Sequence, residues 1–143
     1  MKEAHRTAVV VMRAATTLGF LTTLVLAALA GLFTPGDVDL LAWHSTFATV
    51  LAVLVLIQLG DSVALWRGTA RLRWPLGANA LVVVMVVVQM GLGDSRILSG
   101  HMPLGTAICA AEAVLAHWSF GLRTARRTTA ARGEAVSAHG EAV

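Results

Sequence analysis

Two histidines, His44 and His101, stand inside long apolar stretches of this 143-residue chain. A neutral imidazole is the commonest protein ligand for metals such as iron, copper and zinc. Four residues after each histidine comes a small residue, Ala48 and Gly105 respectively. If both stretches are helical, each small residue lies one turn from its imidazole on the same face, where a flat macrocycle would press on the backbone. The pattern predicts a site for a metal-containing ring such as heme.

A carboxyl group, Glu112, lies eleven residues beyond His101 in the same apolar stretch. Eleven residues rotate a helix by about 1,100°, about 20° from three full turns, so this carboxyl points to the same side about 16 Å deeper. A carboxyl in an apolar interior is either protonated or hydrogen-bonded, so Glu112 has a structural interpretation and a proton-handling one. The expected partners are Asn79 and one threonine of the first apolar run, Thr22 or Thr23, with Gln58 slightly deeper.

The composition predicts how these side chains are held in place. Hydrophobic residues make up 57% of the chain and charged residues 13%, and the mean hydropathy is +0.74. A soluble domain of this size cannot hide so much apolar surface. Four apolar runs each have about the 20 residues that cross a hydrocarbon layer of ~30 Å. We expect helices at about 9–33, 40–66, 74–93 and 99–122.

The short connections between these runs predict an all-α fold, an integral membrane antiparallel four-helix bundle with up-down-up-down topology. Residues 1–13 form an N-terminal tail, residues 14–122 form the transmembrane bundle, and residues 123–143 form a basic tail. That last segment lacks apolar periodicity, so we expect it to be disordered with its arginines against anionic head groups.

Ten of the eleven basic residues lie in the two tails or in the loop between the second and third runs, and only Arg96 lies on the other side. The positive-inside rule therefore predicts that both termini are cytoplasmic. The high isoelectric point of about 10.5 follows from this topology and gives no reason to expect nucleic-acid binding. The single cysteine, Cys109, excludes disulfide chemistry that needs cysteine pairs.

Helical rise places three polar side chains at one depth. His44, His101 and Gln89 each lie five residues from the nearest charge at the outer end of their own run. At 1.5 Å per residue, all three lie about 7 to 8 Å inside those charges. The second and fourth helices are diagonal in such a bundle, about 11–14 Å apart, because neighbouring axes are ~8–10 Å apart. This is roughly the room that a porphyrin ligated from both faces requires.

The histidine of the second run, the residues Gln89 to Gly93 (QMGLG) at the end of the third, and the histidine that opens the fourth resemble one four-helix half of heme A synthase. They also resemble small four-helix bacterial membrane proteins with the same two histidines. The resemblance covers about residues 40–121. It implies that His44 and His101 are the axial ligands of a heme, and that the protein lies in the bacterial cytoplasmic (inner) membrane.

Two positions differ from the catalytic half of that family. A glutamate stands there three residues before the first histidine, where this chain has Leu41, and an arginine often follows the histidine, where this chain has Ser45. The outer-loop cysteine pair of some members is also missing. These differences argue against heme A synthesis, and against an enzyme, while leaving heme binding open.

The first functional hypothesis is a membrane protein that binds heme b through His44 and His101, near Ala48, Gly105, Gln89 and Gly93, and serves electron transfer, heme handling or sensing. Its partners would be the lipid bilayer and either a membrane redox complex or further copies of itself. The alternative is a cofactor-free accessory or scaffold subunit whose polar layers fix the helix register. Transport of a small molecule through the Glu112 layer is a third reading, disfavoured because four helices leave little room for a pathway and no inverted repeat is evident.

Overall fold

The chain forms four long α-helices. The computed structural model describes the backbone of residues 2–32, 38–68 and 73–140, and the side chains of residues 6–32, 39–67 and 73–122. The helices are α1 (Lys2–Leu32), α2 (Val38–Gly68), α3 (Arg73–Asp94) and α4 (Leu98–Gly140). No strand occurs in these described segments, so the prediction of an all-α fold is confirmed.

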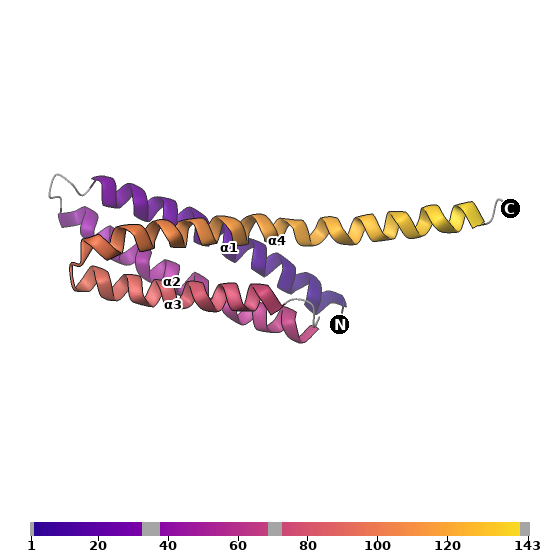
Figure 1. The fold of residues 1–143 in the computed structure, drawn as a ribbon, viewed down its shortest axis with the longest axis horizontal. Helices are drawn as coiled ribbons and strands as arrows, with labels where there is room; N and C mark the ends of the chain where they lie inside the picture. Colours follow the sequence, from indigo (N-terminus) through magenta and orange to yellow (C-terminus); the bar gives the residue numbers. More distant parts are fainter. Residues whose placement is uncertain (1, 33–37, 69–72, 141–143) are drawn as a thin grey trace.

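Each helix packs against two others. α1 lies against α2 and α4, and α3 lies against α2 and α4 (Figure 1). Over the described residues, no close backbone approach joins α1 to α3 or α2 to α4. These two pairs are therefore the diagonals of the assembly, as the sequence predicted for α2 and α4.

Successive helices begin and end at opposite ends of the molecule, and the last part of α4 extends well beyond the other three (Figure 1). The sequence predicted a helix ending at 122 and disorder beyond it, but the backbone stays helical to Gly140. Alanine and arginine are frequent in this last segment, and both are strong helix formers.

The apolar core is small and comes mainly from three helices. Its buried side chains are Leu51, Val55, Val82, Val86, Ile108 and Leu115. Many other large apolar side chains point outward, including Leu81 at 60% and Val87 at 64% exposure on α3. By length and composition, three helices of the described chain suit a membrane span, within Arg6–Leu32, Asp39–Arg67 and Arg73–Asp94.

The fourth expected span, on α4, does not reach the same apolarity. Its apolar stretch carries His101, Pro103 and Glu112. Polar groups are rare in a membrane helix and usually face the interior of the bundle when they occur. α4 thus contributes one polar side chain, His101 or Glu112, to each of the two layers described below.

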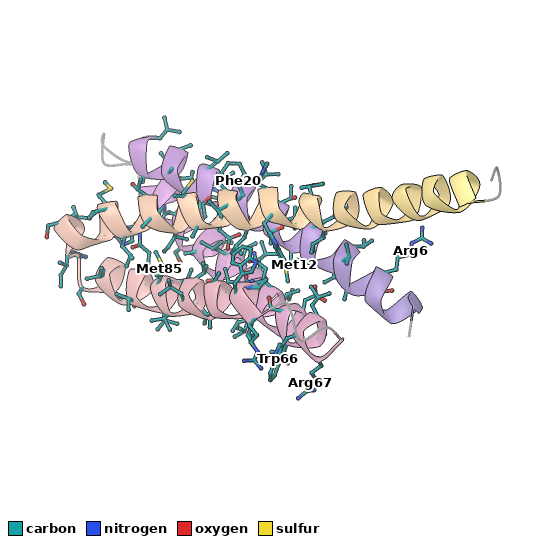
Figure 2. The ribbon with its side chains drawn as sticks, turned by 45° about the vertical axis from the view of Figure 1, so that its right-hand side comes forward. Arg6, Met12, Phe20, Trp66, Arg67 and Met85 are labelled. Carbon is teal, nitrogen blue, oxygen red and sulfur yellow. The ribbon has the colours of Figure 1, made fainter. Side chains whose placement is uncertain are left out.

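The charged side chains of Arg6 and Arg67 lie near the ends of α1 and α2, away from the buried apolar side chain of Met12. Met12 is fully buried among the helices, whereas Arg6 and Arg67 extend outward at the ends of α1 and α2 (Figure 2). Trp66 lies beside Arg67 and is 38% exposed. An amphipathic ring next to a basic residue at a helix end is typical of a membrane–water interface.

Candidate functional site

The two histidines lie side by side although their helices are diagonal. The ring centres of His44 on α2 and His101 on α4 are 6.2 Å apart, and the ring planes are inclined by 48°. Both side chains are half-buried. Two imidazoles that bind one metal ion from opposite sides, with metal–nitrogen bonds of about 2.0 Å, have ring centres about 6 Å apart. The observed separation therefore matches that of an imidazole pair sharing one metal.

The turn between α3 and α4 fixes the position of His101. Arg96 adopts a left-handed backbone conformation with φ of 56°. The backbone N–H of Ile97 donates to the carbonyl of Leu92 at 2.9 Å, which closes the end of α3. α4 then begins directly, so His101 lies in its first turn and faces the last turns of α3.

The backbone of α3 orients the His101 ring. His101 Nδ1 lies 3.1 Å from the carbonyl oxygen of Gln89. A carbonyl oxygen only accepts hydrogen bonds, so the neutral ring has its proton on Nδ1 and its lone pair on Nε2. The ring also packs on Gly93, where an added Cβ would lie 3.2 Å from His101 Cε1. This arrangement resembles that of metal-binding histidines, in which the N–H of the second ring nitrogen commonly donates a hydrogen bond to a carbonyl oxygen.

His44 keeps one ring nitrogen without a partner. Its Nδ1 is buried and has no hydrogen bond. The ring also interacts with the backbone of Leu26 on α1 and with His101. A buried polar atom without a partner is uncommon and requires an explanation, such as a ligand or a bound water. The residues at this end of the bundle therefore fit a group that accepts an imidazole lone pair.

The space next to Gly105, one of the two small residues near the histidines, is already filled by another side chain. An added Cβ at Gly105 would lie 2.9 Å from the side-chain nitrogen of Gln89, so this amide covers Gly105. Gln89 Oε1 is buried and has no hydrogen-bond partner. Ala48 is half-buried on α2. Entry of a macrocycle next to Gly105 would require the Gln89 side chain to turn away.

No larger metal-ligand cluster is present in the part of the chain that the structure describes. No three histidine, cysteine, aspartate or glutamate side chains come together there as a metal site would require. Cys109 is a partly buried free thiol. A metal held at this site would therefore have two protein ligands among the described residues, His44 and His101.

Glu112 lies in the second polar layer, fully buried with Gln58. Gln58 Nε2 on α2 donates to Glu112 Oε2 on α4 at 3.0 Å and lies 3.2 Å from the carbonyl oxygen of Ala15 on α1. The pair packs against Gly19, where an added Cβ would lie 2.5 Å from Glu112 Oε2. Gln58 therefore reaches Glu112 across the diagonal because α1 carries no side chain at this point.

Asn79 and the threonines, the predicted partners of Glu112, are wrong, whereas Gln58, predicted slightly deeper, is its partner and the whole predicted layer is buried. Asn79 donates to Ser62 Oγ on α2 and to the carbonyl of Pro75, both at 2.9 Å. Thr22 and Thr23 donate to carbonyls one turn earlier in α1, at 2.7 Å each. A threonine in a helix satisfies its hydroxyl locally in this way, which leaves it unavailable as a donor to another helix.

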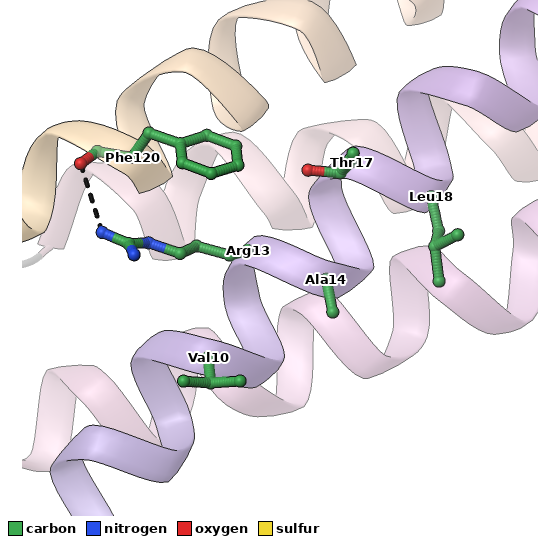
Figure 3. A pocket seen from close by; sticks show the side chains of 6 residues that line it. All are labelled: Val10, Arg13, Ala14, Thr17, Leu18 and Phe120. Atoms are coloured by element: carbon green, nitrogen blue, oxygen red, sulfur yellow. Dashed lines mark hydrogen bonds between the residues drawn. The ribbon is translucent and has the colours of Figure 1, made fainter.

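Arg13 joins the middle of α1 to the middle of α4. Its Nε donates to the carbonyl of Ser119 at 3.1 Å and its Nη2 to the carbonyl of Phe120 at 3.2 Å, and the guanidinium lies 5.2 Å from the centre of the Phe120 ring (Figure 3). Thr16 Oγ1 also lies 3.2 Å from Ser119 Oγ. Arg13 and Phe120 also line an open apolar groove of about 510 Å³ between the two helices, together with Val10, Ala14, Thr17 and Leu18.

Sequence reasoning missed Gly19, Ser62 and the contacts of Arg13. Ser62 lies four residues after Gln58, on the same face of α2, so its spacing was a usable signal. Nothing near Gly19 in the sequence distinguishes it from the exposed glycines.

Comparisons of the chain with models of known families, with characterised proteins and with solved structures gave no match.

Proposed function

We propose that this protein is an integral membrane heme-binding protein that holds heme b between His44 and His101. Its four helices would cross the bilayer as an antiparallel bundle. Three helices with the length and apolarity of a span, and the outward-facing aliphatic side chains of α3, support the membrane setting. Polar groups such as Gln58 and Glu112 are turned inward, as expected when the surroundings are hydrocarbon.

The observation that carries the proposal is the 6.2 Å separation of the two imidazole centres. Two histidines on diagonal helices approach this closely only because both lie at one depth and on inward faces. The lone pair on His101 Nε2 and the unpartnered His44 Nδ1 are suited to bind a metal. Two neutral imidazoles would complete the coordination of an iron that already has four porphyrin nitrogens.

The chain's own residues would position the group. The Gln89 carbonyl holds His101 in one tautomer and one orientation and makes its free nitrogen a better ligand. Gly93 leaves room for the imidazole to pack against α3. A heme bound with two histidines supplies one-electron transfer, and the roles that follow are electron transfer, heme handling or sensing near the outer face of the membrane.

The basic residues support an orientation with both termini in the cytoplasm. In that orientation, the histidine layer lies near the outer face of a bacterial inner membrane and the Arg13 contacts lie near the cytoplasmic face. A redox partner in the membrane, or a second copy of this chain, would exchange electrons with a heme at this depth.

A visible absorption spectrum tests the proposal. The protein is produced with added heme, purified in detergent and compared with His44→Ala, His101→Ala and the control His117→Ala, whose side chain is exposed on α4. We expect a Soret band in the wild type and the control. We expect its loss or a large change in both of the other variants, because each loses one axial ligand. An absent Soret band, or one unchanged in both variants, contradicts heme ligation by this pair.

One observation favours a second candidate, a cofactor-free accessory or scaffold subunit. The Gln89 amide fills the space over Gly105, as expected of a layer that only fixes helix register. This candidate predicts that the histidine variants change stability without any spectral change. It also predicts stoichiometric co-purification with a larger membrane complex.

A further inference from the structure

The strongest unexplained feature outside the histidine layer is the carboxyl of Glu112. Its side chain is 0% exposed, and only one of its two oxygens has a hydrogen bond. Oε2 accepts from Gln58 Nε2 at 3.0 Å, whereas Oε1 is buried without a partner. An ionised carboxylate in this setting would need several donors or a cation to offset its desolvation.

Among the described residues, the amide side chains of this layer have unpaired acceptors and no unpaired donor. Gln58 Oε1 and Asn79 Oδ1 are also buried without a partner, and both side chains are 0% exposed. The amide nitrogens of both residues are already bonded, to Glu112 and to Ser62. An added proton on the carboxyl would provide the donor that this layer lacks.

We propose that Glu112 and Gln58 form a proton-binding site, in which Glu112 holds a proton on Oε1 and donates it to Gln58 Oε1. A carboxylic acid and a primary amide pair naturally in this way, with the amide N–H donating to one acid oxygen and the acid O–H donating to the amide oxygen. The first of these two bonds is present at 3.0 Å. The ligand is a hydrogen ion, and the bound form is a neutral acid in the interior of the bundle.

The other helices bring few charges to this site. On α1, the nearest titratable group is Arg13, which is engaged with two carbonyls of α4. On α2, Asp61 follows Gln58 by three residues, and its Oδ2 is buried without a partner. On α3, the polar group of this layer is the uncharged amide of Asn79. On α4, Cys109 is partly buried and His117 is exposed.

Gly19 supports the site on the third side. An added Cβ there would lie 2.5 Å from Glu112 Oε2 and 2.7 Å from Gln58 Nε2. The acid–amide pair therefore lies directly against the α1 backbone, in a space that only glycine leaves open. This close fit keeps the two side chains together and restricts the access of water and of larger cations.

Infrared spectroscopy of the purified protein in lipid tests the proposal. We expect the C=O stretch of a protonated carboxylic acid at neutral pH, a shift of that band in D2O, and its loss in Glu112→Gln, which keeps the size of the side chain. The band should shift to higher frequency in Gln58→Leu, because the acid loses its partner. The control Asp94→Asn, at an exposed position, should leave the band unchanged.

Three outcomes would overturn the proposal. The first is the absence of any protonated-acid band in the wild type at neutral pH. The second is a band that persists in Glu112→Gln and disappears in Asp61→Asn, which would assign the proton to Asp61. The third is a band removed by sodium ions at constant pH, which would identify a cation site. None of these measurements depends on heme, so they fail or succeed independently of the histidine layer.

Discussion

The substitution Gly19→Ala tests how closely Glu112 and Gln58 pack against α1. The new Cβ would lie 2.5 Å from Glu112 Oε2 and 2.7 Å from Gln58 Nε2, both well inside van der Waals contact. Overpacking of a buried site costs about 1–3 kcal/mol. Displacement of the Gln58–Glu112 hydrogen bond adds about 0.6 kcal/mol, the average for interhelical bonds in a membrane protein.

Gly60→Ala is the matched control, because nothing lies within 4 Å of an added Cβ at that position on α2. Replacement of a helical glycine by alanine stabilises a helix by at most ~1 kcal/mol, and both variants share this gain. We therefore expect the free energy of unfolding of Gly19→Ala to lie about 1.6–3.6 kcal/mol below that of Gly60→Ala, from the overpacking and hydrogen-bond terms.

The assay is equilibrium unfolding in mixed micelles, followed by circular dichroism and tryptophan fluorescence. A double-mutant cycle makes the assay more specific, because Glu112→Ala removes Oε2, the atom nearest to the new methyl group, and leaves Gln58 Nε2 in place. The loss caused by Gly19→Ala should be smaller in the Glu112→Ala background. Equal stabilities of Gly19→Ala and Gly60→Ala, or a loss that is the same in both backgrounds, would refute the close contact.

Three further contacts give predictions of the same kind. Arg13→Gln should reduce the free energy of unfolding by about 1–2 kcal/mol, because two hydrogen bonds to carbonyls of α4 are lost; an unchanged unfolding curve would contradict this. Asn79→Leu should destabilise by about 1 kcal/mol in the same assay, and Ser62→Ala should add little to it because the two side chains bond each other at 2.9 Å. Additive effects would show that they act separately. The rings of Trp74 and Trp118 meet edge to face with centres 5.0 Å apart, so a double-mutant cycle of their leucine variants should give a coupling of about 0.5–1.5 kcal/mol. A coupling of zero would contradict that contact.

Several features of the fold could be predicted from residue order. Long apolar runs predicted an all-α chain, and three of the four expected spans have the length and apolarity of a membrane helix. Counting from the outer charges placed His44, His101 and Gln89 at one depth, and in the structure the two rings and the Gln89 carbonyl do lie together. The helical rise is constant, so depth follows directly from position in the sequence.

The sequence by itself therefore determined that His44, His101 and Gln89 lie at one height on three helices. The tertiary structure alone decided which side chains meet. Gln58 takes the place predicted for Asn79 beside Glu112, since α1 presents Gly19 at that point and Asn79 turns toward Ser62. It also decided that Gln89 covers Gly105. Side-chain pairing depends on the rotation of each helix about its axis and on the volume left by its neighbours, and neither quantity is set by spacing along one helix.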